Sequence, residues 1–98
     1  MYKISNIIHS LRGCVNTDYQ EIEKLAKQAL YILASYLSLV KDERELRLIN
    51  EVIDRVNRTY NNLKSNGNKS GKESKSSLEM ALSSVSYVQV EDLGKGIS

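Results

Sequence analysis

The pattern of apolar and polar positions predicts three helices in the first 64 residues. The first is short: Ile4, Ile7, Ile8 and Leu11 recur at i, i+3, i+4 and i+7, which places them on one face of a helix. Gly13 follows directly and is a residue type that commonly ends helices. About eleven residues are too few for a helix that persists alone in water, so this segment is expected to pack against a larger neighbour.

The second predicted helix runs from about Thr17 to Val40. Thr17 and Gln20 form a capping-box pattern, and Asp18 and Glu21 lie near the positive end of the helix dipole. Its apolar residues cover an arc of about 180°, wider than the stripe of about 100° that one neighbour requires. We therefore expect two contacts, with the first and third helices or with a second copy of the chain. The arc comprises Ile22, Leu25, Ala26, Ala29, Leu30, Ile32, Leu33, Tyr36, Leu37, Leu39 and Val40.

The third predicted helix begins near Asp42, where Asp42 and Glu45 repeat the capping pattern, and ends before Gly67. Its apolar residues keep helical period throughout: Leu46, Ile49, Val52, Ile53, Val56, Tyr60 and Leu63. Because only one or two residues separate it from the second helix, the two are expected to fold back as an antiparallel hairpin. Residues 1–64 are thus predicted to form an all-α three-helix bundle, near the size at which one core is only marginally stable.

Residues 65–77 interrupt this pattern. The segment consists only of Ser, Asn, Gly, Lys and Glu. Such a composition cannot bury enough apolar surface to offset the entropy of ordering. The segment is therefore predicted to be a flexible linker with a reach of roughly 20 Å.

Residues 78–98 are predicted to be an interaction tail, with a short helical stripe followed by a β-favouring stretch. Its candidate partner-binding residues are Leu78, Leu82, Val85, Tyr87, Val88 and Val90. The extended part could add a strand to the sheet edge of a partner. In that case, Val88→Lys with Val90→Lys should remove binding and leave thermal stability almost unchanged. Two alternatives remain: residues 78–85 return to the hairpin as a fourth helix, or the tail is disordered.

The face of the second helix opposite its apolar arc is another candidate contact surface. This face carries Lys27, Tyr31, Ala34, Ser35 and Ser38. Small residues let a neighbouring backbone approach closely, and an exposed tyrosine is a common interface anchor. An ordinary solvated helix face is the main interpretation, with a docking surface as the alternative.

Four arginines project from the third helix opposite its apolar stripe: Arg44, Arg47, Arg55 and Arg58. Taken alone, this pattern is typical of a phosphate-binding ridge. Three i, i+4 ion pairs of favourable orientation account for it without a ligand: Glu43–Arg47, Glu51–Arg55 and Asp54–Arg58. A solvated, salt-bridged face is therefore the main interpretation, with an acidic protein partner or nucleic acid as alternatives.

Composition argues against several classes of function. The single cysteine, Cys14, and the single histidine, His9, cannot supply a zinc site within the chain, and no glycine-rich phosphate-binding motif occurs. A net charge of +2 is too mild to indicate nucleic-acid binding by itself. We expect no metal, cofactor, small-molecule substrate or catalytic activity. The lone cysteine, the lack of an apolar run of about 20 residues and the lack of a secretory signal predict a cytoplasmic protein.

The main functional hypothesis is a non-enzymatic accessory or adaptor subunit. Its hairpin would dock on a larger protein assembly or on its own copy, and residues 78–93 would engage a second site. A nucleic-acid-processing complex such as a polymerase holoenzyme is one kind of host. The alternative is a small dimeric nucleic-acid-binding regulator that uses the arginines of the third helix. Phosphate contacts would make its binding fall steeply as the salt concentration rises.

Overall fold

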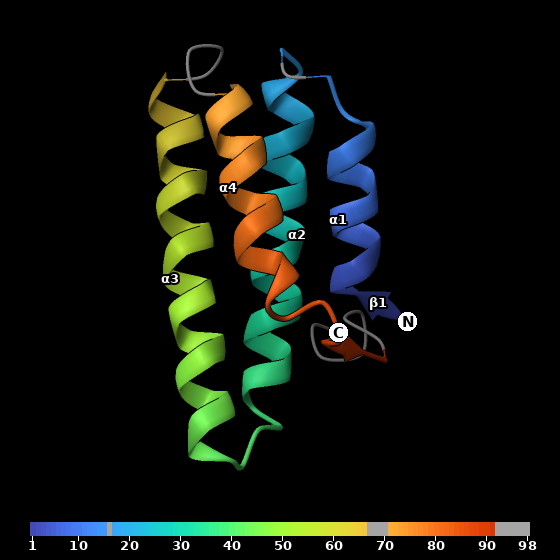
Figure 1. The fold of residues 1–98 in the computed structure, drawn as a ribbon, viewed down its shortest axis with the longest axis vertical. Helices are drawn as coiled ribbons and strands as arrows, with labels where there is room; N and C mark the ends of the chain where they lie inside the picture. The colour runs from blue at the N-terminus through green and yellow to red at the C-terminus, as the bar shows by residue number, and fades with distance from the viewer. Residues whose placement is uncertain (16, 67–70, 92–98) are drawn as a thin grey trace, which may run out of the picture.

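The computed structural model describes residues 1–15, 17–66 and 71–91, which form a bundle of four helices (Figure 1). The helices are α1 (Ile4–Gly13), α2 (Tyr19–Leu37), α3 (Glu43–Asn66) and α4 (Gly71–Ser83). Two short strands, β1 (Tyr2–Lys3) and β2 (Gln89–Val90), pair antiparallel beside the bundle. The predicted all-α fold class is confirmed. Within the described ranges, no helix combines the length and apolar character needed to cross a membrane.

Helices α2 and α3 begin at the predicted capping residues Asp18 and Asp42, whereas no side chain caps α1. The Asp18 carboxylate accepts a hydrogen bond from the main-chain N–H of Glu21 at 3.4 Å, and the Asp42 carboxylate accepts one from Arg44 at 2.8 Å. Both bonds satisfy main-chain donors that a helix leaves unpaired in its first turn. The second helix is shorter than predicted, because α2 ends at Leu37 and Leu39 lies in the following turn.

The wide apolar arc of α2 is used inside the chain. This helix contacts α1, α3 and α4, and its buried side chains form the middle of one continuous core. In Figure 1, α4 crosses in front of α2, with α3 and α1 on either side. The arc is wide because three helices share it, which agrees with the expectation of more than one neighbour.

The predicted flexible linker over residues 65–77 is not what the structure shows. Residues 65 and 66 end α3 and residues 71–77 form the first half of α4, while residues 67–70 lie outside the described part. Gly71 and Ser74 are buried, and the Lys75 ammonium donates to the main-chain oxygen of Cys14 at 2.7 Å. Composition is misleading here because the small residues allow close helix packing, and tertiary contacts override weak local preferences.

The segment predicted to be an exposed tail instead completes the core. Leu78, Leu82, Val85 and Val88 are 0% exposed, and Val90 is 8% exposed. The β-favouring stretch does form a strand, but its partner is the start of the same chain: Tyr2 pairs with Val90 and Lys3 with Gln89. The described part of this segment matches the fourth-helix alternative. Residues 92–98 lie outside the described part.

A cluster of two tyrosines and a glutamate fixes the segment that follows α4. The hydroxyls of Tyr36 and Tyr87 both donate to the same oxygen of Glu45, at 3.1 and 2.8 Å. The two rings meet edge to face with their centroids 6.3 Å apart. The cluster therefore ties together α2, α3 and the connection between α4 and β2.

Because of this cluster, the stability of the fold is expected to fall at alkaline pH. Burial, followed by the hydrogen bond to Glu45 and its negative charge, raises the pKa of Tyr87 to about 12. A tyrosine in an unfolded chain titrates near pH ~10. The protonated Tyr87 hydroxyl therefore stabilises the folded state fully below pH ~10, and this stabilisation is lost as the pH rises through about 12. Urea unfolding should show a steeper loss of stability from pH 10 to 12 in the native chain than in Tyr87→Phe. Parallel pH profiles would contradict this prediction.

One buried hydroxyl has no hydrogen-bond partner. Ser74 is 2% exposed, and its Oγ is the unsatisfied buried side-chain atom in the described part of the chain. Burial of such a group costs about 1–3 kcal/mol, and alanine also has the higher helix propensity. Ser74→Ala is therefore expected to raise the free energy of unfolding by about 1 kcal/mol. Denaturant unfolding alongside the exposed Ser76→Ala variant measures this, and a destabilised Ser74→Ala would contradict it.

Candidate protein-docking face

The outer side of α2 brings together three of the five residues predicted there. Lys27, Tyr31 and Ala34 line a shallow hollow of about 260 Å³ together with Leu30. Their spacing of three and four residues stacks them on consecutive helix turns. Tyr31 is 50% exposed, so half of a large aromatic side chain is open to contact at the edge of the hollow. We call the surface formed by these four residues the α2 docking face.

The other two predicted residues have a different role. The Ser38 hydroxyl donates to the main-chain oxygen of Ser35 at 2.8 Å, which satisfies a carbonyl at the end of α2. Ser35 is itself half-buried. Sequence reasoning also missed Leu30, which it assigned to the apolar arc. The structure leaves Leu30 half-buried between the core and the hollow.

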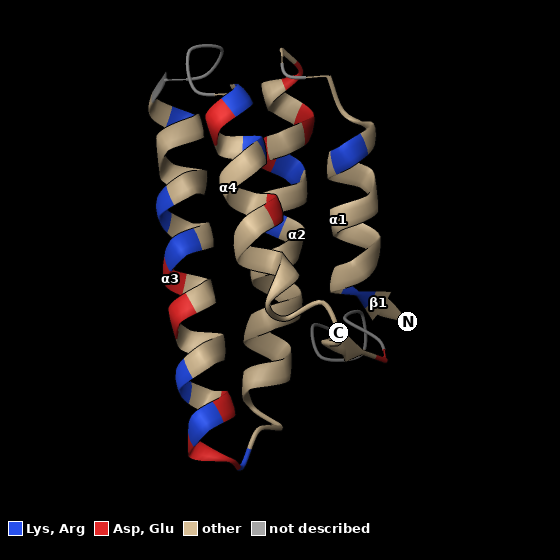
Figure 2. Ribbon diagram, in the orientation of Figure 1, with Lys and Arg blue, Asp and Glu red and all other residues tan. Residues whose placement is uncertain are grey.

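Beyond Lys27, the half of α2 that carries the α2 docking face lacks charge. Residues 28–40 contain no Asp, Glu, Lys or Arg. Figure 2 shows this half of α2 without blue or red, whereas the neighbouring α3 carries both. Leu39, just beyond the helix, is 67% exposed. An uncharged surface with exposed aromatic and aliphatic side chains costs little to dehydrate, and depletion of charge is typical of the centre of protein interfaces.

The residues predicted to form a binding tail make contacts within the folded chain instead. Five of the six are buried in the core: Leu78, Leu82, Val85, Val88 and Val90. The sixth, Tyr87, is 53% exposed, but its hydroxyl is bonded to Glu45. A partner could reach the five buried side chains only if the core opened.

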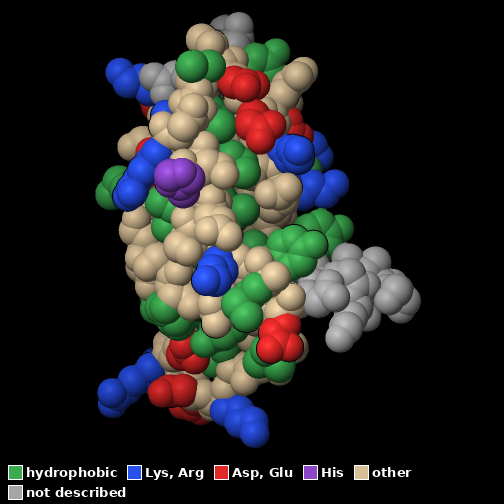
Figure 3. Space-filling model, turned by 90° about the vertical axis from the view of Figure 1, so that its right-hand side faces the viewer, with side chains coloured by type: hydrophobic (Ala, Val, Ile, Leu, Met, Phe, Trp, Pro, Cys, Tyr) green, Lys and Arg blue, Asp and Glu red, His purple; other side chains and the backbone are tan. Residues whose placement is uncertain are grey.

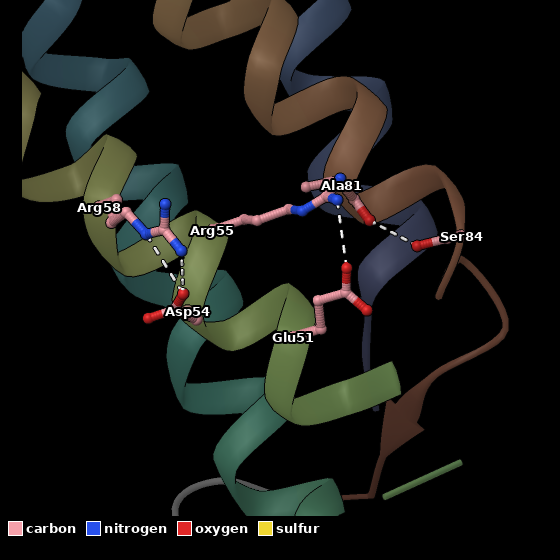
Figure 4. A network of polar contacts seen from close by, with 6 residues as sticks. All are labelled: Glu51, Asp54, Arg55, Arg58, Ala81 and Ser84. Atoms are coloured by element: carbon pink, nitrogen blue, oxygen red, sulfur yellow. Dashed lines mark hydrogen bonds and ion pairs between the residues drawn. The ribbon is translucent and has the colours of Figure 1, made fainter. Parts of the chain in front are cut away.

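The four arginines of α3 are exposed, and Figure 4 shows two of them, Arg55 and Arg58, beside their acidic partners. Two of the three predicted ion pairs are confirmed: Arg55 bonds to Glu51 at 3.1 Å, and Arg58 bonds to Asp54. Between Glu43 and Arg47, both within the described ranges, no ion pair forms. Exposed pairs of this kind contribute little to stability, because solvent screens them. They do, however, compensate the charge of two of the four arginines, as the main interpretation of this face predicted.

The lone thiol has no features of a nucleophile. Cys14 is half-buried, and burial raises the pKa of its thiol, with further contributions from the negative charges of Glu21 and Asp18. The reactive thiolate is therefore disfavoured at neutral pH. His9 is exposed on α1. No group of three or more metal-binding side chains occurs in the part of the chain that the structure describes.

No protein-family model matches the chain, and comparisons with curated proteins and with solved structures give no significant match. The function is therefore inferred from the surface of the chain itself. The α2 docking face is the feature on which both the sequence pattern and the structure converge.

Proposed function

We propose that the chain is a non-enzymatic adaptor that docks on a larger protein through the α2 docking face. The observation that carries this proposal is the hollow lined by Leu30, Tyr31, Ala34 and the Lys27 side chain, at the edge of an uncharged half of a helix. The opposite face of α2 is already buried in the core, so the hollow is not needed to hold the bundle together. A cytoplasmic location, supported by the single cysteine, belongs to the same proposal.

The size of the face bears on the affinity. Residues 27–37 of α2 extend over about 15 Å, and a strip one helix wide offers no more than a few hundred Å². A standard interface buries about 800 Å² on each partner. Docking through this face alone is therefore expected to be weak, and a stable complex would need additional contact area on adjoining elements.

Ala34→Arg tests the proposal, because it places a long charged side chain at the hollow on an exposed helix position. The matched control is Asn57→Arg, which adds the same charge at an exposed position of α3. Both variants should unfold within a few °C of the native chain, because surface substitutions usually change stability by less than about 0.5 kcal/mol. Each is used to co-purify partners from nuclease-treated native extract.

We expect a specific protein to be retained by the native chain and by Asn57→Arg, and to be lost from Ala34→Arg. Because the contact is apolar, retention should persist at about 0.5 M salt, where binding through several phosphates would be strongly weakened. Retention of the same proteins by Ala34→Arg would refute docking through α2. Proteins retained only in a parallel extract without nuclease, and lost in salt, would favour the arginines of α3 instead.

A further inference from the structure

A second hollow, of about 370 Å³, lies between β1, α1 and α2. Its lining consists of Met1, Tyr2, Lys3, Asn6, Ile7, Ser10, Gln28 and Ile32. The hollow borders both residues of β1 and no residue of β2, so it lies on the side of β1 that faces away from its partner strand. We call it the β1 hollow.

Main-chain geometry leaves hydrogen-bonding groups on that side of β1. The Ile4 N–H donates to the Val88 carbonyl at 3.0 Å, and Tyr2 pairs with Val90. In an antiparallel pair, alternate residues direct their N–H and C=O groups to opposite edges. The Lys3 N–H and the Met1 carbonyl therefore point away from β2. These two groups flank Tyr2, and their spacing allows both to form hydrogen bonds with one additional strand.

The side chains around the β1 hollow suit a peptide. Ile7 and Ile32 are 6% and 2% exposed and form an apolar floor. Asn6, Ser10 and Gln28 are exposed at its rim, and no hydrogen bond to another described residue occupies their side chains. Amide and hydroxyl groups of this kind can bond the main chain of an extended segment, while an apolar floor accepts one of its side chains.

The charge of the β1 hollow selects between possible occupants. Lys3 carries the one charged side chain among its lining residues, and the α-amino group of Met1 adds a second positive charge. A second copy of the chain, paired antiparallel around Tyr2, would place Lys3 opposite Met1 of the other copy, whose α-amino group is also positive, and like charges directly opposite are destabilising. A segment with a carboxylate near Lys3 is complementary. Figure 3, which faces this side of the molecule, shows a blue side chain near the centre of a largely tan and green area, with further charged side chains above and below it.

We propose that the β1 hollow binds an extended, acidic and apolar segment of another protein, which pairs with β1 as a third strand. This site is separate from the α2 docking face and does not depend on it. Because Gln28 and Ile32 follow Lys27 and Tyr31 on α2, the two surfaces adjoin. One partner that occupied both would gain the contact area that α2 alone does not provide.

The probe is a synthetic peptide, acetyl-Thr-Val-Glu-Val-Thr-amide, titrated into the isotope-labelled full chain while its backbone amide signals are recorded by NMR. We expect saturable shifts centred on Lys3, Asn6 and Gln28. A peptide with lysine in place of glutamate should bind about threefold more weakly or worse, as for an exposed charge pair. A peptide with methylated main-chain nitrogens should not bind, because it cannot donate to a strand edge.

Gln28→Trp places a bulky, uncharged side chain at the β1 hollow, and Gln20→Trp adds the same residue at an exposed position of α2 outside it. Binding should be lost from the first variant and kept by the second. Shifts that are absent, that lie elsewhere, or that persist with the methylated peptide or in Gln28→Trp would overturn the proposal. Ala34→Arg should bind the peptide normally, so a failure of the α2 docking face is distinguished from a failure of this site.

Discussion

A chain that ends at Ser65 is expected to lose cooperative folding. The truncation removes Leu78, Leu82 and Val85, which are fully buried in the native chain. Burial of each such side chain contributes about 1.5–3 kcal/mol, so the three together contribute roughly 5–9 kcal/mol. That sum is comparable to the total stability of about 5–15 kcal/mol for a small domain. The truncation also uncovers the apolar surfaces of α1, α2 and α3 that pack on α4.

Thermal unfolding followed by circular dichroism measures this effect. The matched control ends at Glu91 and so keeps α4 and β2 while it removes residues 92–98. We expect the control to unfold in one sharp transition near the midpoint of the full chain. The shorter chain should lose helix content gradually, without such a transition. A sharp transition at the same temperature in the shorter chain would mean that α4 does not contribute to the core.

Val88→Lys is expected to destabilise the fold severely, whereas Gln89→Lys is not. Val88 is 0% exposed and its neighbour Gln89 is exposed, so adjacent lysines would lie in opposite environments. An unpaired charge in the core costs about 3–5 kcal/mol. For a domain of this size, the melting temperature should fall by at least about 12 °C. The structure thus reverses the expectation, drawn from sequence, that lysine at this position leaves thermal stability unchanged.

The comparison of the two lysine variants separates packing from the effect of charge. Both change the net charge equally, and both lie in the same short segment. Calorimetry or circular dichroism gives the two melting temperatures directly. Equal melting temperatures for both variants would show that Val88 is not in the core and would restore the hypothesis of a tethered motif.

The first three helices could be predicted from the sequence because their information is local. Ile4, Ile7, Ile8 and Leu11 repeat with helical spacing, and all four are buried. The capping sequences around Asp18 and Asp42 also act within one helix turn. The outer face of α2 followed from the same periodicity, because a helix with one buried side must expose the other.

The remainder depends on contacts between residues that are distant in sequence. Lys75 bonds to the carbonyl of Cys14, 61 positions away, and Tyr87 bonds to Glu45, 42 positions away. Neither pair leaves a periodic signal. The β-favouring stretch predicted the strand but not its partner, since β1 contains only two residues. The β1 hollow could not be predicted from the sequence, because three separate elements form it.

Residues 78–90 belong to the folded domain, so that the outer side of α2, and not a tail, is the surface proposed for a partner. Hydrogen exchange of the full chain tests this assignment most directly. The amides of Val85 and Val88 donate to the carbonyls of Leu82 and Val85 at 3.1 and 3.0 Å. We expect both amides to exchange about a thousandfold more slowly than in an unstructured peptide, close to the rate of Leu33 in the core of α2. Exchange of Val85 and Val88 at the unstructured rate, with Leu33 still protected, would contradict this fold and return the segment to the role of a free tail.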